Sequence, residues 1–368
     1  MKVLITGSRG FIGQNLLQFL KLKSGIDILE YNHKDKVEKL KKIIQNADFI
    51  FHLAGINRTY KKRNYLQSNY ELTKKICNFA TNSKKNIPIL FSSSRQVLLN
   101  NAYGESKKKA ERVLLSYKRK TGAQVYIYRL PNVFGKWCKP NYNSVVATFC
   151  YNISRNLPIK INDSSTKLNL VYIDDVIESF CKILDKKYTN KKFFKVYPIY
   201  KTTVGKLVEY IKNFKNIRKT LLVDKVGSGF FRALYSTYIS FLPKKHFSYP
   251  LSNFSDDRGS FVEVLKTKNS GQFSFFTANK GCKRGGHFHH SKTEKFLVLQ
   301  GKARFCFKHL VTNKKYKLIF SDKVPTIVES IPGWSHDITN IGNNKLIVML
   351  WSNEIFDIKK PDTHENPV

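Results

Sequence analysis

Tyr103 and Lys107 are the strongest candidates in this chain for a catalytic pair that transfers a proton. On a helix, residues four positions apart share one face. A free phenol has a pKa of about 10, and a nearby cation favours the phenolate, so the pair could transfer a proton at neutral pH. The chain is rich in Tyr and Lys, so the same spacing also arises by chance on a solvated helix face. A catalytic pair would need a hydride donor, a third hydroxyl and a carbonyl substrate.

A third hydroxyl is expected shortly before this pair. Residues 88–94 have the pattern of a strand and end in three serines. We expect a triad in which Ser94 orients the substrate oxygen, Tyr103 passes the proton, and Lys107 tunes the phenol and holds a nicotinamide ribose. The alternative is that Ser94 is an ordinary serine between a strand and a loop.

The N-terminal segment predicts the hydride donor. Residues 2–6 are an apolar, strand-like run, residues 7–13 have the spacing G-x-x-G-x-x-G, and a helical pattern follows. Such glycines allow a tight turn and a close approach of the backbone to a pyrophosphate at the helix N-terminus. A third strand, residues 47–55, ends in small residues that can also approach the cofactor. Besides Tyr103 and Lys107, the residues expected to bind the dinucleotide are Gly7, Arg9, Gly10, Phe11, Ile12, Gly13, His33, Leu53 and Ala54.

The end of the second expected strand, residues 26–30, carries side chains that could distinguish NAD from NADP. Glu30 could accept a hydrogen bond from a ribose 2′-hydroxyl, which would favour NAD. Arg9, His33 and Lys34 could instead bind a 2′-phosphate, which would favour NADP. We predict NADPH, and leave NADH as the alternative.

The C-terminal third of the chain contains a possible metal site. Short strand patterns separated by Gly and Asn begin near residue 256 and indicate an antiparallel β-barrel or sandwich. Alternation along a strand places His287 and His289 on one face, Glu294 follows, and His336 comes later. Three imidazoles and a carboxylate form a ligand set for a divalent metal, with zinc the first expectation. We call these four residues, His287, His289, Glu294 and His336, the metal box. The alternative is that the protein has the four residues but binds no metal there.

Several segments of the N-terminal part resemble the extended short-chain dehydrogenase/reductase family, most of whose members act on nucleotide sugars. The resemblance covers about residues 1–245 and rests on segments 7–13, 52–55, 92–94, 103–107, 129–135 and 171–175. It implies that Asn132 approaches the nucleotide diphosphate. Sugar dehydratases of this family have Asp-Glu after the catalytic hydroxyl, where this chain has Arg95 and Gln96. That difference argues against a dehydratase and leaves a reductase or an epimerase.

The C-terminal part resembles the cupins. The spacings H-x-H-x4-E-x6-G and P-G-x-x-H-x3-N match both halves of the cupin signature, and segment 257–261 resembles the sugar 3-epimerase branch. This resemblance implies that Arg258 meets the nucleotide diphosphate. A polar connector bracketed by prolines, residues 243–250, marks the expected boundary. The predicted fold is therefore an α/β Rossmann-type extended short-chain dehydrogenase/reductase domain, residues 1–245, followed by an all-β cupin barrel, residues 246–368.

Across its full length the chain resembles the bifunctional capsular-polysaccharide enzymes of the UDP-N-acetyl-L-fucosamine pathway, most specifically in segments 134–149, 234–238 and 293–298. The resemblance implies the substrate UDP-2-acetamido-2,6-dideoxy-β-L-arabino-hexos-4-ulose. The cupin would epimerise C3, and the reductase would then reduce the C4 ketone with NADPH to give UDP-2-acetamido-2,6-dideoxy-β-L-talose. A reductase with a purely structural or dimerising cupin is the alternative.

Composition narrows the other possibilities. The formal net charge is +39, but the lysines are spread along the whole chain and no zinc-finger or RNA-binding motif accompanies them. We therefore expect no specific nucleic-acid partner, and keep a polyanion-binding protein as a third alternative. Scattered cysteines without a C-x-x-C, no signal peptide and no long apolar run predict a cytoplasmic protein without a membrane span. A homodimer is expected, because cupin barrels often pair.

Overall fold

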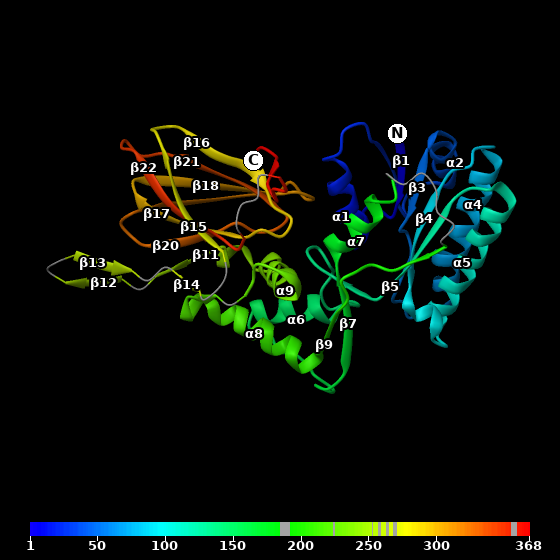
Figure 1. Cartoon of the computed structure of the whole chain (residues 1–368), viewed down its shortest axis with the longest axis horizontal. Helices are drawn as coiled ribbons and strands as arrows, with labels where there is room; N and C mark the ends of the chain where they lie inside the picture. The colour runs from blue at the N-terminus through cyan, green and yellow to red at the C-terminus, as the bar shows by residue number, and fades with distance from the viewer. Residues whose placement is uncertain are drawn as a thin grey trace. The chain divides into compact units, whose positions relative to one another are not determined.

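The computed structural model describes residues 1–184, 192–223, 225–251, 253–256, 259–262, 265–267, 271–354 and 359–368. They pack as two compact units (Figure 1). Unit 1 contains Met1–Phe134, Asn141–Ser144 and Leu168–Lys201, and unit 2 contains Gly135–Pro140, Val145–Lys167 and Thr202–Val368. Unit 2 therefore includes the helical segments within Val145–Lys167 and 202–245 as well as the C-terminal strands. A functional boundary at residues 245 and 246 stays a prediction.

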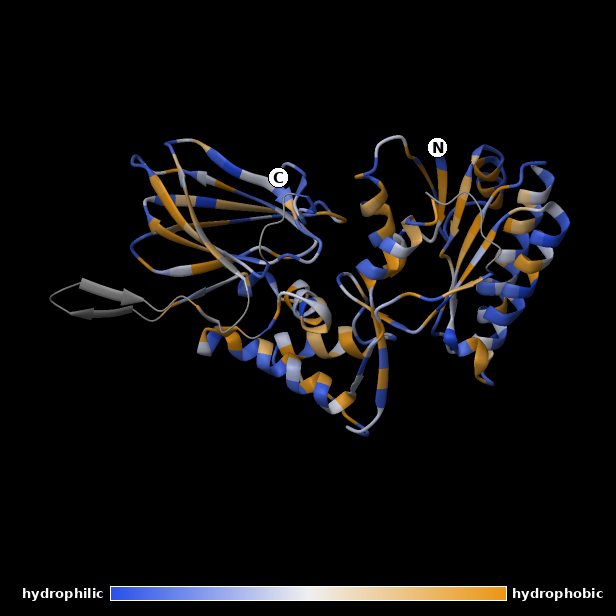
Figure 2. Ribbon diagram, viewed as in Figure 1, coloured by the Kyte–Doolittle hydropathy of each residue, from blue (hydrophilic) through white to orange (hydrophobic). Residues whose placement is uncertain are grey.

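Unit 1 is built on a parallel sheet with the order β2-β1-β3-β4-β5-β8. The strands are β1 (Lys2–Thr6), β2 (Asp27–Tyr31), β3 (Phe49–His52), β4 (Ile89–Ser94), β5 (Val125–Leu130) and β8 (Phe193–Phe194). The central strands read as almost continuous apolar runs because both of their faces are covered (Figure 2). The strand order reverses between β1 and β3, and in such sheets ligands bind at the carboxyl ends beside that point.

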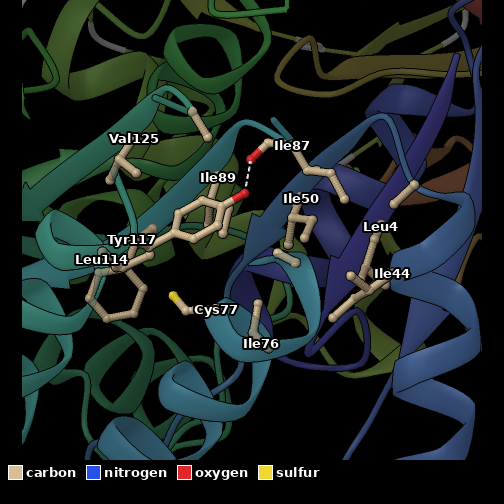
Figure 3. Packing of buried hydrophobic residues seen from close by; sticks show 14 of the residues in the cluster. Leu4, Ile44, Ile50, Ile76, Cys77, Ile87, Ile89, Leu114, Tyr117 and Val125 are labelled. Atoms are coloured by element: carbon tan, nitrogen blue, oxygen red, sulfur yellow. Dashed lines mark hydrogen bonds between the residues drawn. The ribbon is translucent and has the colours of Figure 1, made fainter. Parts of the chain in front are cut away.

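Helices cover both faces of this sheet. Helices α1 (Phe11–Leu20) and α7 (Ile173–Cys181) lie together on one face, and α2 (Val37–Asn46), α4 (Leu72–Asn82) and α5 (Ala102–Thr121) cover the other (Figure 1). The core under α4 and α5 joins Leu4, Ile50, Ile76 and Leu114, among others (Figure 3). The chain before α4 forms a short helix, α3 (Lys62–Tyr65), and a π-helical turn, η1 (Leu66–Glu71). The segment from Lys62 to Asn82 is therefore helical but is not one regular α-helix.

A small sheet and a helical layer follow in the chain. The sheet has the order β6-β7-β9, with β6 (Asn132–Phe134), β7 (Lys167–Tyr172) and β9 (Tyr200–Thr203). In unit 2, α6 (Val145–Ser154), α8 (Val204–Thr220) and α9 (Gly229–Ser240) pack on one another. Hydrophobic residues of α8 recur about every three or four positions, so one face is apolar and packs inward (Figure 2); its buried residues are Leu207, Val208, Ile211, Phe214 and Ile217.

The rest of unit 2 is an antiparallel barrel of two facing sheets. One has the order β11-β20-β17-β22-β15 and the other β19-β18-β21-β16-β23. Their bounds are β11 (Ser248–Pro250), β15 (Gln272–Ala278), β16 (Lys283–Phe288), β17 (Glu294–Gln300), β18 (Lys302–His309), β19 (Lys315–Ser321), β20 (Thr326–Glu329), β21 (Trp334–Asn340), β22 (Leu346–Ser352) and β23 (His364–Glu365). The remaining elements are η2 (Arg95–Leu98), β10 (Leu222–Val223), η3 (Lys244–His246), β12 (Asn253–Asp256), β13 (Gly259–Val262) and β14 (Lys266–Thr267). The predicted fold class, a Rossmann-type domain followed by an all-β barrel, is confirmed.

A buried ion-pair cluster joins α8 to the barrel. Arg218 and Lys295 each pair with the carboxylate of Glu329, and Lys295 also donates to the hydroxyl of Tyr249 at 3.1 Å. The side chains of Lys295 and Glu329 are each 3% exposed. Despite the burial, the two cations hold the pKa of Glu329 below its ordinary value. Among the helices of the described residues, none combines the length and the apolar character of a membrane-spanning helix.

Candidate active site and metal box

The glycine turn after β1 has little room for side chains. Gly7 has a φ of +74°, and a Cβ added there would lie 2.8 Å from the Cα of Ala54. A Cβ on Gly13 would lie 2.1 Å from the carbonyl oxygen of Gly7. Gly10 precedes α1, and no side chain caps this helix N-terminus. The first N–H groups of α1, from Phe11 onward, thus have no side-chain cap at this end, and diphosphate binding there stays a prediction.

The end of β2 carries the residues relevant to the ribose. Ser8 donates a hydrogen bond from its hydroxyl to a carboxylate oxygen of Glu30 at 2.5 Å. The Oδ1 atom of Asn32 accepts the main-chain N–H of Arg9 at 3.1 Å. The side chains of Arg9 and His33 are exposed. Glu30 is thus partly engaged by Ser8, and the preference for NADPH stays a prediction.

Two residues of the expected triad, Ser94 and Tyr103, lie side by side, and Lys107 follows one turn later on α5 (Ala102–Thr121). Ser94 ends β4, where its Oγ accepts the N–H of Gln96 at 3.2 Å, and its side chain is hydrogen-bonded to the phenol of Tyr103. Tyr103 lies in the first turn of α5, whose start is set by Asn101 accepting the N–H of Gly104 at 2.8 Å. A Cβ on Gly104 would lie 2.1 Å from the carbonyl oxygen of Gln96, so α5 packs directly on the turn that follows Ser94.

The pKa values of Tyr103 and Lys107 differ from the expectation. Burial raises the pKa of Tyr103 to about 12, while the hydrogen bond to Ser94 opposes the rise. Lys107 is also buried, and this burial lowers the pKa of its ammonium to about 8, with Glu111 opposing the fall. Its Nζ donates to the carbonyl oxygen of Ser92 at 2.9 Å. The predicted acidification of the phenol by Lys107 is therefore not seen, because desolvation dominates at Tyr103.

Ser93 and Ser94, which are adjacent in β4, have different partners. Ser93 donates to Glu111 at 2.6 Å, and the guanidinium of Arg129 binds the same carboxylate at 2.6 Å and 3.0 Å. Ser93 is therefore committed to a buried structural pair. Ser94 keeps its side chain beside Tyr103.

The sequence did not reveal the role of Asn69, which lies in the π-helical turn η1. Its Nδ2 donates to the carbonyl oxygen of Ile56 and to the hydroxyl of Ser106, each at 3.0 Å, while its Oδ1 accepts the N–H of Ile56 at 3.1 Å. Ser106 in turn donates to the carbonyl oxygen of Tyr103 at 2.7 Å. Asn69 thus ties the loop after β3 to the first turn of α5. A buried Asn on an otherwise amphipathic helix was the available signal.

The remaining candidates are Asn132 and Arg258 for the substrate, and Leu53 and Ala54 for the dinucleotide. Asn132 begins β6 and is exposed, with Leu170 as its partner across the strand pair. Leu53 and Ala54 follow β3 beside the glycine turn and are half-buried. Arg258 lies outside the described residues.

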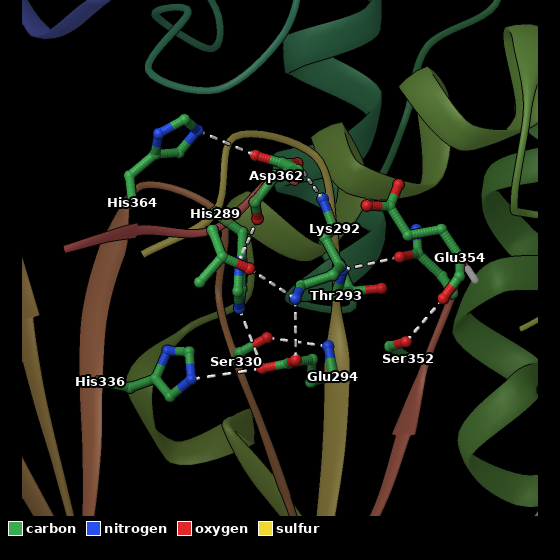
Figure 4. Close-up of polar contacts among 12 residues, drawn as sticks. His289, Lys292, Thr293, Glu294, Ser330, His336, Ser352, Glu354, Asp362 and His364 are labelled. Atoms are coloured by element: carbon green, nitrogen blue, oxygen red, sulfur yellow. Dashed lines mark hydrogen bonds and ion pairs between the residues drawn. The ribbon is translucent and has the colours of Figure 1, made fainter. Parts of the chain in front are cut away.

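In the barrel, all four predicted metal ligands come together. The ligand atoms of His287, His289, Glu294 and His336 lie within 4.8 Å of one another. Strand pairing brings His336 of β21 opposite His287 of β16. One oxygen of Glu294, Oε2, lies 2.9 Å from Nε2 of His289 and 3.4 Å from Nε2 of His336 (Figure 4).

The ionisation of this box suits a divalent cation. Burial, aided by the neighbouring histidines, lowers the pKa of His287 to about 3, so its imidazole is neutral at pH 7. Burial opposes ionisation of Glu294, yet His289 and His336 hold its pKa well below the ordinary value. Neutral imidazoles and an ionised carboxylate are the protonation states in which these groups bind metals. Three nitrogen ligands and one oxygen ligand fit Zn²⁺.

Two family models match the chain. The NAD dependent epimerase/dehydratase family matches residues 3–197, and the polysaccharide biosynthesis C-terminal domain matches residues 254–364. The chain is 51% identical over 364 residues to a UDP-2-acetamido-2,6-beta-L-arabino-hexul-4-ose reductase from Pseudomonas aeruginosa, covering 99% of this chain and 98% of the relative.

Two solved structures are also similar to the chain. The capsular polysaccharide assembling protein CapF from Staphylococcus aureus is 39% identical, with a TM-score of 0.68 and coverage of 100% of both chains. A UDP-glucuronic acid 4-epimerase from Bacillus cereus shares the fold over 59% of this chain, with 18% identity and a TM-score of 0.54. The family resemblance inferred from the sequence is confirmed. The chain belongs to the family of the UDP-2-acetamido-2,6-beta-L-arabino-hexul-4-ose reductase, in which an NAD-dependent epimerase/dehydratase region precedes a polysaccharide biosynthesis C-terminal domain.

Proposed function

We propose that this protein is an NADPH-dependent nucleotide-sugar 4-ketoreductase with a 3-epimerase activity in its barrel. Its substrate would be UDP-2-acetamido-2,6-dideoxy-β-L-arabino-hexos-4-ulose, and its product UDP-2-acetamido-2,6-dideoxy-β-L-talose, for UDP-N-acetyl-L-fucosamine and surface polysaccharide synthesis. The name of the Pseudomonas relative, a reductase of such a keto sugar, supports the choice of substrate.

The observation that carries the reductase proposal is the position of the segment after β3. Ala54 lies against Gly7 of the glycine turn, and a Cβ on the next residue, Gly55, would lie 3.3 Å from Nζ of Lys107. The diphosphate end and the proton-transfer end of the site therefore flank one short segment at the carboxyl edge of the parallel sheet. A dinucleotide lying along that edge would bring its nicotinamide toward Tyr103 and Ser94.

The chain's own residues provide the proton for the reduction. When bound, reduced NADPH supplies the hydride to C4. With a pKa raised to about 12, Tyr103 is a protonated phenol at neutral pH and can donate to the oxygen at C4 as charge develops there. Ser94, hydrogen-bonded to this phenol, would orient the same oxygen. Lys107, with a pKa of about 8, keeps a positive charge beside the pocket at neutral pH.

The metal box would serve the epimerisation. The C3 hydrogen of the substrate lies next to the C4 ketone, so it can leave as a proton when the resulting negative charge is stabilised. A divalent metal held by His287, His289, Glu294 and His336, for which we propose zinc, would supply that stabilisation. The base that takes the C3 proton is not assigned.

One observation favours a second candidate, a reductase whose barrel has only a structural or dimerising role. His287, His289, Glu294 and His336 provide four protein ligand atoms, and a closed set of four protein ligands is typical of structural zinc sites. Solvent exchange separates the two candidates. The wild-type protein, the chelated protein and His336→Ala would each be incubated with the keto sugar in D2O without NADPH. Deuterium at C3 with the wild type alone would support epimerisation at the box, and exchange in all three would exclude the box.

The reductase itself is tested by NADPH and NADH consumption with the same keto sugar, followed by NMR of the product at C3 and C4. Oxidation of NADPH with a talo-configured product would support the full proposal. Salt-sensitive DNA binding without any cofactor oxidation would instead favour a polyanion-binding protein. We also propose a homodimer, which sedimentation would test.

A further inference from the structure

Lys292 holds one of the two oxygens of the ligand carboxylate in the metal box. Its Nζ lies 3.2 Å from Oε1 of Glu294 and donates to the hydroxyl of Thr363 at 2.9 Å. The other oxygen, Oε2, is the one near His289 and His336 (Figure 4). Lys292 is 8% exposed, so solvent competes little for its ammonium. The two oxygens of Glu294 therefore have different partners.

Asp362, from the C-terminal segment, holds the loop that carries Lys292. Its carboxylate accepts the main-chain N–H groups of His290, Ser291 and Lys292 at 2.8 Å, 2.8 Å and 2.7 Å. Its carbonyl oxygen lies 2.5 Å from Nδ1 of His289. A carbonyl oxygen can only accept, so Nδ1 of His289 carries the proton and Nε2 is free to bind a metal.

A salt bridge from α9 supports the same anchor. Nη2 of Arg232 lies 3.0 Å from a carboxylate oxygen of Glu354 and 3.7 Å from one of Asp362, and it also contacts the hydroxyl of Ser291. The loop is thus held by the C-terminal segment and by a helix that precedes the barrel in the sequence. Such contacts around metal ligands orient them and tune the site.

We infer that Lys292 is a positioning residue that keeps Glu294 a one-oxygen ligand, and that Asp362 holds Lys292 in place for this purpose. A carboxylate with two free oxygens can take two positions on a metal. With Oε1 held by Lys292, three imidazoles and one oxygen bind the metal, and a further position stays free for the ketone oxygen of the substrate. This inference rests on the proposed function only in that the box holds a divalent metal.

The test uses the full-length protein loaded with Co²⁺, without substrate, and the variant Lys292→Met. Met has a similar length and no charge, so Glu294 can then use both oxygens. The visible Co²⁺ absorption should lose intensity as the coordination number rises, and azide should bind at least about tenfold more weakly because its position is taken. Lys292→Arg, which keeps the cation, should restore the wild-type spectrum. A Lys292→Met spectrum and azide affinity identical to the wild type would overturn the inference.

Two further variants keep the test decisive. Lys283→Met is a matched control, because Nζ of Lys283 lies 3.3 Å from the buried carboxylate of Asp337, next to His336 in the same barrel. It should leave the spectrum unchanged, and an equal change there would reduce the effect to a general loss of charge. Asp362→Asn should weaken metal binding about 10- to 100-fold in competition with a chromogenic chelator. If Lys292→Met does not fold, this variant tests the inference without it. Unchanged metal affinity in Asp362→Asn would contradict the anchoring role.

Failure of this inference can be told apart from failure of the proposed function. The spectra, azide binding and metal affinity are all read without substrate. Absence of C3 exchange in the wild type would contradict the proposed epimerase activity. The Co²⁺ spectra would still decide whether Lys292 positions Glu294.

Discussion

Gly104 lies so close to Gln96 that a Cβ at position 104 would be 2.1 Å from the carbonyl oxygen of Gln96. This contact sets the distance between the turn after β4 and the first turn of α5, and hence between Ser94 and Tyr103. Glycine is required here by packing against backbone and not by its dihedral angles, because the residue is helical.

The first prediction follows from that contact. Gly104→Ala must shift α5 away from the turn, and a displacement of about 1 Å at a reacting group can cost about 100-fold in rate. We expect kcat for NADPH oxidation to fall by about that factor. Gly122→Ala, at the other end of α5, is the control: its φ is +74° and nothing lies within 4 Å of an added Cβ. It should cost about 1 kcal/mol of stability from backbone strain and leave kcat unchanged.

The second prediction separates the two chemical steps. Tyr103→Phe removes the proton donor of the reduction, so NADPH oxidation should fall about 100- to 10,000-fold while C3 exchange in D2O continues. Tyr117→Phe is the matched control, because this buried phenol on the same helix donates to the carbonyl oxygen of Ile87 at 2.9 Å (Figure 3). Its loss should cost about 1 kcal/mol of stability and no activity. Parallel loss of both reactions in Tyr103→Phe would contradict two separate sites.

The third prediction concerns acid stability. His52 is buried between the hydroxyls of Thr6 and Thr73, each 2.8 Å from a ring nitrogen, and burial, aided by the charge of Lys107, lowers its pKa to about 3. Unfolded, its pKa would be about 6.5. Between these values the unfolded chain binds a proton that the folded chain does not, so stability falls as the pH drops from 6.5 towards 3.

The loss from this histidine could reach about 5 kcal/mol across that range. His52→Asn should therefore flatten the pH dependence of unfolding, followed by far-ultraviolet circular dichroism in denaturant. His33→Asn, at an exposed position, should leave the slope of the wild type unchanged. An equal slope in wild type and His52→Asn would count against a neutral, buried His52.

The fourth prediction tests the cluster that joins α8 to the barrel. Arg218→Met leaves the buried carboxylate of Glu329 with Lys295 as its remaining cation, so unit 2 should lose about 3 kcal/mol of stability. All three tryptophans, Trp137, Trp334 and Trp351, lie in unit 2, so their fluorescence reports its unfolding.

An exposed pair provides the comparison for this measurement. Lys39→Met removes the pair with Asp35 in unit 1, in which the lysine side chain is 49% exposed. Followed by far-ultraviolet circular dichroism, because the tryptophans lie in unit 2, it should change stability by less than about 1 kcal/mol. A loss in Arg218→Met no larger than this would show that the cluster does not hold α8 in place.

Features that depend on local backbone geometry could be predicted from the sequence. The spacing of Gly7, Gly10 and Gly13 predicted a tight turn. The strand pattern before it and the helix pattern after it predicted the Rossmann-type domain. The alternation of His287 and His289 likewise follows from strand periodicity, which is local, whereas Glu294 and His336 were recognised by the spacing of the cupin signature. These features needed no knowledge of distant contacts.

Tertiary structure decided the features that depend on desolvation and on contacts between distant segments. Burial, which no spacing reveals, raises the pKa of Tyr103 although Lys107 lies one turn away. The π-helical turn that carries Asn69 forms where that residue bonds to the loop after β3. Asp362 reaches the loop of the metal ligands only because β23 pairs with β16 and brings the end of the chain there. A hydrogen bond between residues some seventy positions apart depends on how the strands pair, and that pairing exists only in the folded chain.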